Sequence, residues 1–148
     1  MKKSEKAIAL FDQGFNCSQS VLTAFSKEYN ISEDDCLKIS CAFGGGMGRQ
    51  QLTCGAVTGA LMVLGLHFGR AKGDDISRKI TTYEKAVEFF ESFKDLNGAT
   101  DCKELLQGLD MHNPTDLKKI ESLGLFKTSC YKYAKDAVEI AEKMIHQG

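Results

Sequence analysis

The sequence has little proline, almost no net charge and no long apolar segment. Pro114 is the single proline in 148 residues, and β-branched runs are few, which favours helices. Nineteen basic residues against twenty acidic ones give a net charge of −1, so the charge offers no basis for binding nucleic acid. The longest apolar stretch, residues 56–68, is shorter than the roughly 20 residues of a membrane span. No apolar segment follows the charged N-terminus, as a signal peptide requires. We expect a soluble cytoplasmic protein without membrane insertion.

Cysteine is the residue type that stands out among those present. Six cysteines are too few for a small protein held together by disulfides. In a reducing compartment, cysteines that cluster are more often metal-binding or catalytic. The other proportions, 43% hydrophobic and 26% charged, are those of a soluble globular protein.

Apolar residues recur at helical spacing along the chain. The pattern predicts longer helices at 4–13, 17–29, 32–42, 54–68, 74–94 and 128–146, and short ones at 100–106 and 114–120. The segment 74–94 is amphipathic, with apolar residues at helical spacing that are Ile76, Ile80, Tyr83, Val87 and Phe90, next to Ala86 and Phe93. We expect the cluster of Phe89, Phe90 and Phe93 to lie in the core. We predict one compact all-α domain over residues 1–148, with about six to seven helices.

The segment 54–68 is rich in small residues, which predicts the central helix of this domain. Gly55, Ala56, Gly59 and Ala60 provide small side chains four residues apart, a spacing that lets another helix approach closely. Such a helix fits either a buried core position or the interface of a homodimer.

Four cysteines share one local setting. Cys17, Cys54, Cys102 and Cys130 each follow a residue of N-cap type and begin a predicted helix. The positive end of the helix dipole favours a thiolate, so we expect lowered pKa values and raised reactivity or metal affinity there. Cys36 and Cys41 do not begin helices, and we expect them in or near the core.

These positions leave several roles open. All six cysteines are alternatively small buried hydrophobic residues. If the four helix starts converge, their thiols form disulfide pairs or a four-thiolate site for zinc or an iron–sulfur cluster. No CxxC motif is present, so the sequence does not support a thioredoxin-type dithiol, a zinc ribbon or a bacterial ferredoxin.

A glycine-rich segment lies just before Cys54. Gly44, Gly45 and Gly46 could present backbone N–H groups to a bound anion or cofactor, with Arg49 as the counter-charge. The alternatives are an ordinary connection or one wall of a cysteine site, where glycine permits close backbone approach.

The cysteine pattern resembles a known family. Cys17, the run from Cys54 to Gly59 (CGAVTG), Cys102 and Cys130 together are similar to the C_GCAxxG_C_C family of redox-active proteins. The resemblance covers essentially the whole chain, although Thr53 departs from the GCA order of the family label. It implies redox activity carried by these four cysteines, with an unknown redox partner or small-molecule acceptor. Genes of the family often lie near transporters, which implies association with a transporter system.

We therefore predict a thiol redox protein, whose cofactor the sequence does not identify: dithiol chemistry requires none, and an iron–sulfur cluster or zinc is the alternative. Cys54 is the predicted reactive thiol, and Cys17, Cys102 and Cys130 are resolving or partner thiols. The alternative is a zinc or iron–sulfur protein that uses the same four thiolates as ligands. A third hypothesis is a helical adaptor for a transporter, in which the cysteines only pack.

Overall fold

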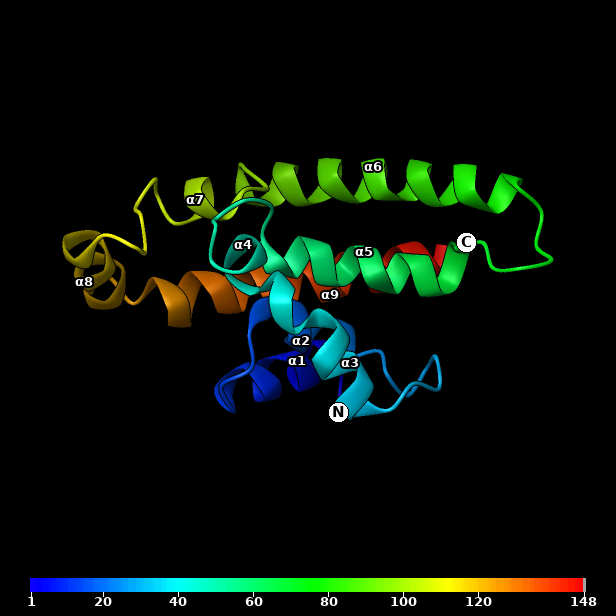
Figure 1. The fold of residues 1–148 in the computed structure, drawn as a ribbon, viewed down its shortest axis with the longest axis horizontal. Helices are drawn as coiled ribbons and strands as arrows, with labels where there is room; N and C mark the ends of the chain where they lie inside the picture. Colours follow the sequence, from blue (N-terminus) through cyan, green and yellow to red (C-terminus); the bar gives the residue numbers. More distant parts are fainter. Residues whose placement is uncertain (148) are drawn as a thin grey trace.

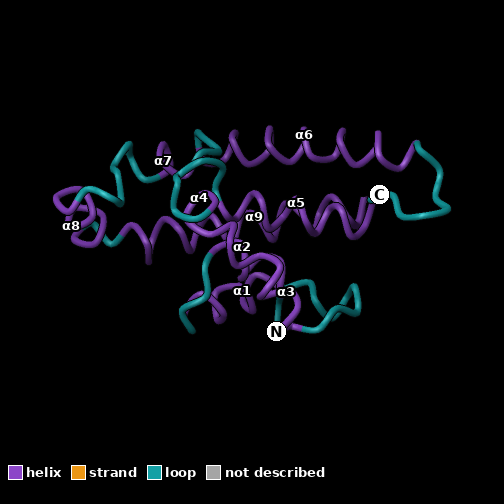
Figure 2. The backbone as a smooth tube through the Cα atoms, viewed as in Figure 1, coloured by secondary structure: helices purple, strands orange, loops and turns teal. Residues whose placement is uncertain are grey.

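The computed structural model describes residues 1–147, and this part of the chain consists of helices joined by loops (Figures 1 and 2). The elements are α1 (Lys3–Asp12), α2 (Cys17–Thr23), α3 (Glu33–Ser40), the 3-10 turn η1 (Cys41–Phe43), α4 (Gly44–Met47), α5 (Gly55–Phe68), α6 (Ser77–Asn97), α7 (Cys102–Leu105), α8 (Pro114–Ser122) and α9 (Leu125–Gln147). Between residues 1 and 147 there is no strand, only an isolated antiparallel bridge between Thr53 and Asp101. The all-α prediction is confirmed.

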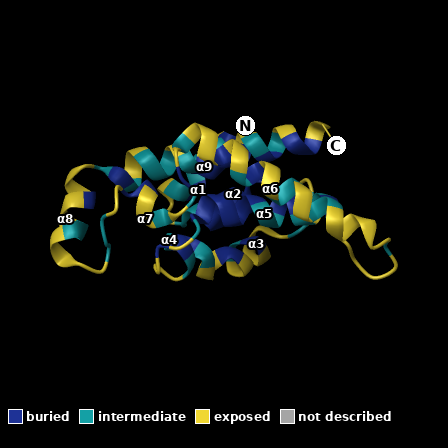
Figure 3. Ribbon diagram, turned by 90° about the horizontal axis from the view of Figure 1, so that it is seen from above, coloured by how far each residue is buried: buried dark blue, intermediate teal, exposed yellow. Residues whose placement is uncertain are grey.

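The three long helices α5, α6 and α9 pack side by side along the long axis of the molecule (Figure 1). The short helices α1 and α2 pack across them and α3 packs on α2, while α8 lies at one end. Coloured by burial, α2 and the first half of α5 form the darkest part of the structure (Figure 3). These two helices therefore form the centre of the fold.

Glycines of α5 determine how closely α2 approaches. A Cβ at Gly59 would lie 2.8 Å from the carbonyl oxygen of Ser18, and one at Gly55 would lie 3.1 Å from the Ser18 amide nitrogen. Side chains at either position would push the two backbones apart. The close packing predicted for this segment is confirmed, and in this chain α2 provides the facing helix.

Local capping explains where α2 begins. The side chain of Asn16 accepts a hydrogen bond from the Gln19 amide, and the Gln19 side chain accepts one from the Asn16 amide. This capping box pairs two N–H groups that a helix start otherwise leaves free. The helix ends at Thr23, earlier than predicted, and hydrogen bonds between residues three apart tighten the following segment into turns.

The prediction for α6 was partly wrong: Phe89 and Phe93 lie in the core as expected, but four other apolar residues do not. Ile76, Ile80, Tyr83 and Val87 are 57%, 56%, 63% and 57% exposed, while Phe89 and Phe93 are fully buried. Helix α6 thus has two apolar faces, and only one of them packs on α5 and α9. Periodicity alone cannot tell which of two apolar faces meets the core.

No helix described between residues 1 and 147 has the length and apolar character needed to cross a membrane.

Candidate functional site

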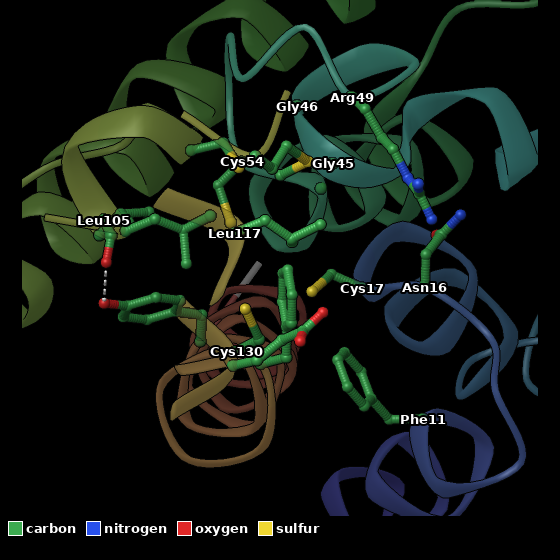
Figure 4. Close-up of a pocket in the computed structure, with 17 residues that line it drawn as sticks. Phe11, Asn16, Cys17, Gly45, Gly46, Arg49, Cys54, Leu105, Leu117 and Cys130 are labelled. Atoms are coloured by element: carbon green, nitrogen blue, oxygen red, sulfur yellow. Dashed lines mark hydrogen bonds between the residues drawn. The ribbon is translucent and has the colours of Figure 1, made fainter. Parts of the chain in front are cut away.

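A cavity of about 320 Å³ lies where α2, α5, α7 and α9 meet, and all four predicted cysteines line it. Cys17, Cys54, Cys102 and Cys130 come from segments far apart in the sequence, so only the fold brings them together. Most of the remaining wall is apolar, from Phe11, Leu105, Leu106, Met111, Leu117 and Phe126. Figure 4 shows the side chains of Cys17 and Cys130 pointing toward each other across this space.

The isolated bridge joins the segments that carry Cys54 and Cys102. The Cys54 amide donates to the Thr100 carbonyl at 2.8 Å, and the Cys102 amide donates to the Leu52 carbonyl at 2.6 Å. Side chains alternate across an extended backbone, so residues on either side of the Thr53–Asp101 pair point to one face. The two cysteines therefore face the cavity from adjacent segments, Cys54 as the N-cap of α5 and Cys102 as the first residue of α7.

Cys17 and Cys130 reach the cavity by different routes. Cys17 is the first residue of α2, and its Cβ is 3.3 Å from where a Cβ at Gly55 would lie. Cys130 lies more than one turn inside α9, which begins at Leu125. The prediction that Cys130 begins a helix was wrong, because the Thr128 hydroxyl donates back to the Gly124 carbonyl instead of capping.

One pair of thiols interacts directly. The interaction with the Cys17 thiol lowers the pKa of Cys130. The same interaction, together with burial, raises the pKa of Cys17 well above its usual value. Of the two thiols, Cys130 is therefore the one that loses its proton more readily.

The other two thiols stay protonated. Burial raises the pKa of Cys54 to about 12, although the amides of Ala56 and Val57 act in the opposite direction. Burial also raises the pKa of Cys102 to about 12. The expectation of lowered pKa values at helix starts was wrong for both residues, because the cost of burying a charge exceeds the helix-end stabilisation.

The glycine-rich segment forms one wall of the cavity. Gly45, Gly46 and Arg49 line it, whereas Gly44 lies against the side chain of Asn16. Gly46 has a φ of 71°, and a Cβ there would lie 2.6 Å from the Leu52 amide nitrogen, so only glycine fits. The anion or cofactor role predicted for these residues stays a prediction.

Gln51, which sequence reasoning missed, ties this wall to the segment before α8. Its side chain is buried, donates to the Leu109 carbonyl at 2.8 Å and accepts from the Met111 amide at 2.9 Å. The ring Nε2 of exposed His112 also donates to the carbonyl of Arg49 at 2.7 Å. No local pattern marks Gln51, because its partners lie about sixty positions further along the chain.

The other two cysteines lie outside the cavity. Cys36 is buried, as expected, but Cys41 is exposed, so its predicted place near the core was wrong. All six cysteines are free thiols. Within residues 1–147 no group of three or more Cys, His, Asp or Glu side chains is placed to hold a metal ion. The four-thiolate centre stays a prediction.

Comparison with known proteins agrees with the cysteine pattern. A family model described as "Putative redox-active protein (C_GCAxxG_C_C)" matches residues 15–144. The chain is also 27% identical to an uncharacterized protein from Archaeoglobus fulgidus over 151 aligned positions, covering 95% of this chain and 93% of that one. No solved structure matches.

Proposed function

This chain belongs to the C_GCAxxG_C_C family of redox-active proteins, and we propose that it carries out thiol–disulfide exchange at the four-cysteine cavity. In this proposal Cys130 attacks the oxidised substrate and Cys17 completes the reaction. Cys54 and Cys102 are partner thiols.

The placement of Cys17 and Cys130, whose side chains point toward each other across the cavity, is the observation that carries the proposal (Figure 4). Thiolates are the nucleophiles of disulfide exchange, and the interaction with Cys17 lowers the pKa of Cys130. It also keeps a second thiol beside the first, where an intramolecular disulfide can form. The sequence favoured Cys54 as the attacking thiol, but the pKa of about 12 leaves almost no Cys54 thiolate at neutral pH.

The reaction moves two electrons from the protein to the substrate. The Cys130 thiolate attacks one sulfur of a substrate R–S–S–R, forms a mixed disulfide and releases RS⁻. That thiolate takes the proton of Cys17, and the new Cys17 thiolate attacks the Cys130 sulfur. A Cys17–Cys130 disulfide forms and the second RS⁻ leaves, so one substrate disulfide is reduced as one protein disulfide is made.

Oxidation in a redox buffer tests this assignment. The reduced protein is equilibrated with mixtures of reduced and oxidised dithiothreitol, and free thiols are alkylated before peptide mapping by mass spectrometry. We expect the loss of two thiols in one step, with Cys17 joined to Cys130. Cys17→Ser and Cys130→Ser should abolish this step.

Two matched variants control for a general effect of cysteine loss. Cys36→Ser removes a buried thiol and Cys41→Ser removes an exposed one, and neither residue lines the cavity. Both should keep the Cys17–Cys130 step unchanged. Oxidation that survives in Cys130→Ser, or a first disulfide that involves Cys36 or Cys41, would overturn the proposal.

A further inference from the structure

The thiol cavity has the size and lining of a site for a small uncharged molecule. Its volume of about 320 Å³ is at the lower end of the range for small-molecule sites. The charged groups in its lining are Arg49, Glu121 and, in the proposed reaction, the Cys130 thiolate, so the cavity has no excess of positive charge for an anion. A large or strongly anionic substrate would therefore gain little binding free energy in this cavity.

The thiols are recessed within this cavity. Cys54 is 5% exposed, and Cys17, Cys102 and Cys130 are only partly exposed. Disulfide exchange requires the attacking sulfur to reach the substrate sulfur directly. A disulfide within a folded protein carries backbone on both sides, which the surface around the cavity would hold away from Cys130.

The walls resist opening. Gln51 holds the glycine-rich segment to Leu109 and Met111 through two hydrogen bonds. On the other side, the hydroxyl of Tyr133 donates to the Leu105 carbonyl at 3.0 Å (Figure 4). Widening the cavity for a large substrate would break bonds of this kind.

We propose that the oxidised substrate is a small, uncharged organic disulfide that enters the cavity whole. This inference rests on the thiol–disulfide exchange proposed above. One substrate disulfide bond breaks and two small thiols form, while Cys17 and Cys130 are oxidised to a disulfide. Glutathione disulfide, which is larger and anionic, and protein disulfides are poor substrates.

Rates with substrates of increasing size test the inference. The reduced wild-type protein reacts separately with dimethyl disulfide, 2-hydroxyethyl disulfide, oxidised glutathione and insulin, and mass spectrometry follows the Cys17–Cys130 disulfide. We expect 2-hydroxyethyl disulfide to react at least about tenfold faster than glutathione disulfide or insulin, after each rate is divided by its rate with free dithiothreitol. If the corrected rates are similar for 2-hydroxyethyl disulfide, glutathione disulfide and insulin, the proposed substrate class is wrong, but the proposed function is unaffected. No Cys17–Cys130 disulfide with any oxidant would instead overturn the proposed function.

A pair of matched variants tests whether the cavity itself discriminates between substrates of different size. Leu117→Trp adds bulk to the lining, and Leu123→Trp adds the same bulk at a position 49% exposed and outside the cavity, at the end of the same helix. Leu117→Trp should slow 2-hydroxyethyl disulfide more than dimethyl disulfide, while Leu123→Trp should slow neither. Equal effects of the two variants would contradict entry through the cavity, and the wild-type series decides the question even if Leu117→Trp fails to fold.

A second, independent observation concerns the outer face of α6. Ile76, Ile80, Tyr83 and Val87 are each more than half exposed and lie four, three and four residues apart. This spacing is that of the a and d positions of a two-stranded coiled coil. In this register Lys79 and Glu84 are the flanking g and e positions.

The charges at these flanking positions indicate which partner the outer face of α6 binds. Among the residues described, neither Lys79 nor Glu84 forms an ion pair within the chain. In a parallel pair of α6 helices, Lys79 of each copy faces Glu84 of the other. In an antiparallel pair the e positions Glu84 and Glu91 face each other, and their like charges repel. We propose that the outer face of α6 binds α6 of a second copy of this chain, in parallel around a two-fold axis.

Sedimentation equilibrium of single variants and a charge swap tests this pairing. The wild type should be a dimer, and Ile80→Glu should be a monomer, whereas Ile39→Glu, a control 58% exposed on α3, should remain a dimer. Glu84→Lys should weaken the dimer, and adding Lys79→Glu to it should restore the affinity. A monomeric wild type, or a dimer that Ile80→Glu leaves intact, would overturn the pairing; a double variant no tighter than Glu84→Lys would overturn the parallel register.

Discussion

The interior around α2 and α5 differs from the interior around α7, α8 and the start of α9. The first is a large apolar cluster that includes Phe25, Phe89 and Phe93, all fully buried. The second has only three buried side chains, Leu106, Ile120 and Leu125. Tight packing holds the long helices together, whereas the sparse packing at the other end leaves room for a cavity.

The four cysteines lie on the boundary between these two clusters. Cys54 belongs to the large cluster and Cys17 packs against it, while Cys102 and Cys130 pack against the small one. A disulfide between Cys17 and Cys130 would therefore join the two clusters. On the proposed function, oxidation of this pair would therefore attach the small cluster more firmly to the large one.

The largest expected effect comes from truncating one aromatic side chain in each cluster. Phe25→Ala should lower the free energy of unfolding by about 3–5 kcal/mol, because it leaves a cavity in a fully packed region. Phe126→Ala should cost about 1 kcal/mol, because Phe126 already borders open space. Urea unfolding measures both, and equal losses would show that the two clusters are packed alike.

Oxidation of Cys17 and Cys130 to a disulfide should stabilise the protein, because the disulfide joins the two clusters covalently. A Cys17–Cys130 disulfide closes a long loop, so the oxidised protein should be about 2–4 kcal/mol more stable than the reduced one. Urea unfolding with and without reductant measures the difference. The gain should vanish in Cys17→Ser and persist in Cys41→Ser, and a gain that remains in Cys17→Ser would point to another disulfide.

Two glycines of α5 have different surroundings: Gly59 is packed closely against α2, whereas Gly65 has open space beside it. Gly59→Ala should cost about 1–3 kcal/mol, because the new Cβ would lie 2.8 Å from the Ser18 carbonyl oxygen. Gly65→Ala meets nothing within 4 Å and should stabilise the helix by about 0.5–1 kcal/mol. Thermal unfolding of the pair measures the contrast, and a neutral Gly59→Ala would contradict the close approach of α2.

Cys54 of the large cluster and Cys130 of the small one should make opposite contributions to the pH dependence of stability. The pKa of Cys54 is raised from 9.0 to about 12. Above pH 9 the unfolded chain loses this proton while the folded chain keeps it, so stability should fall by up to about 1.4 kcal/mol per pH unit. The lowered pKa of Cys130 has the opposite sign: its contribution is fully present above pH 9 and is lost as pH falls through the folded pKa.

Urea unfolding from pH 7 to 10.5 measures this balance in reduced protein. Cys54→Ala should reduce the loss of stability above pH 9, to which the raised pKa values of Cys102 and Cys17 also contribute, and Cys130→Ala should remove the gain between the folded pKa of Cys130 and pH 9. An alkaline loss that is unchanged in Cys54→Ala would show that this thiol is not held protonated in the folded protein.

Much of the fold follows from local sequence. The helix starts at Asn16 and Ser32 are set by side chains that cap within three residues, and the glycines at 55 and 59 indicate close packing on α5. What could not be predicted depends on distant partners. The exposed face of α6 has the same periodicity as its buried face, and Gln51 gains its importance only from segments far along the chain.

The candidate site was found for a reason that proved only partly correct. Helix-start reasoning and the family pattern selected the same four cysteines, and the fold brings all four to one cavity. Yet the thiol with the lowered pKa, Cys130, is the one that does not begin a helix. The pKa of Cys130 depends on Cys17, which is next to it in space but 113 positions away in the sequence. A local sequence pattern therefore cannot reveal this interaction.

The sequence by itself determined the all-helical architecture and the four candidate cysteines, because helical periodicity, capping and cysteine are local properties. The tertiary structure alone decided which thiol has the lowered pKa, which face of α6 meets solvent and where the cavity lies. Burial and sulfur–sulfur hydrogen bonding arise only when distant segments meet, and these two effects set the pKa of each thiol.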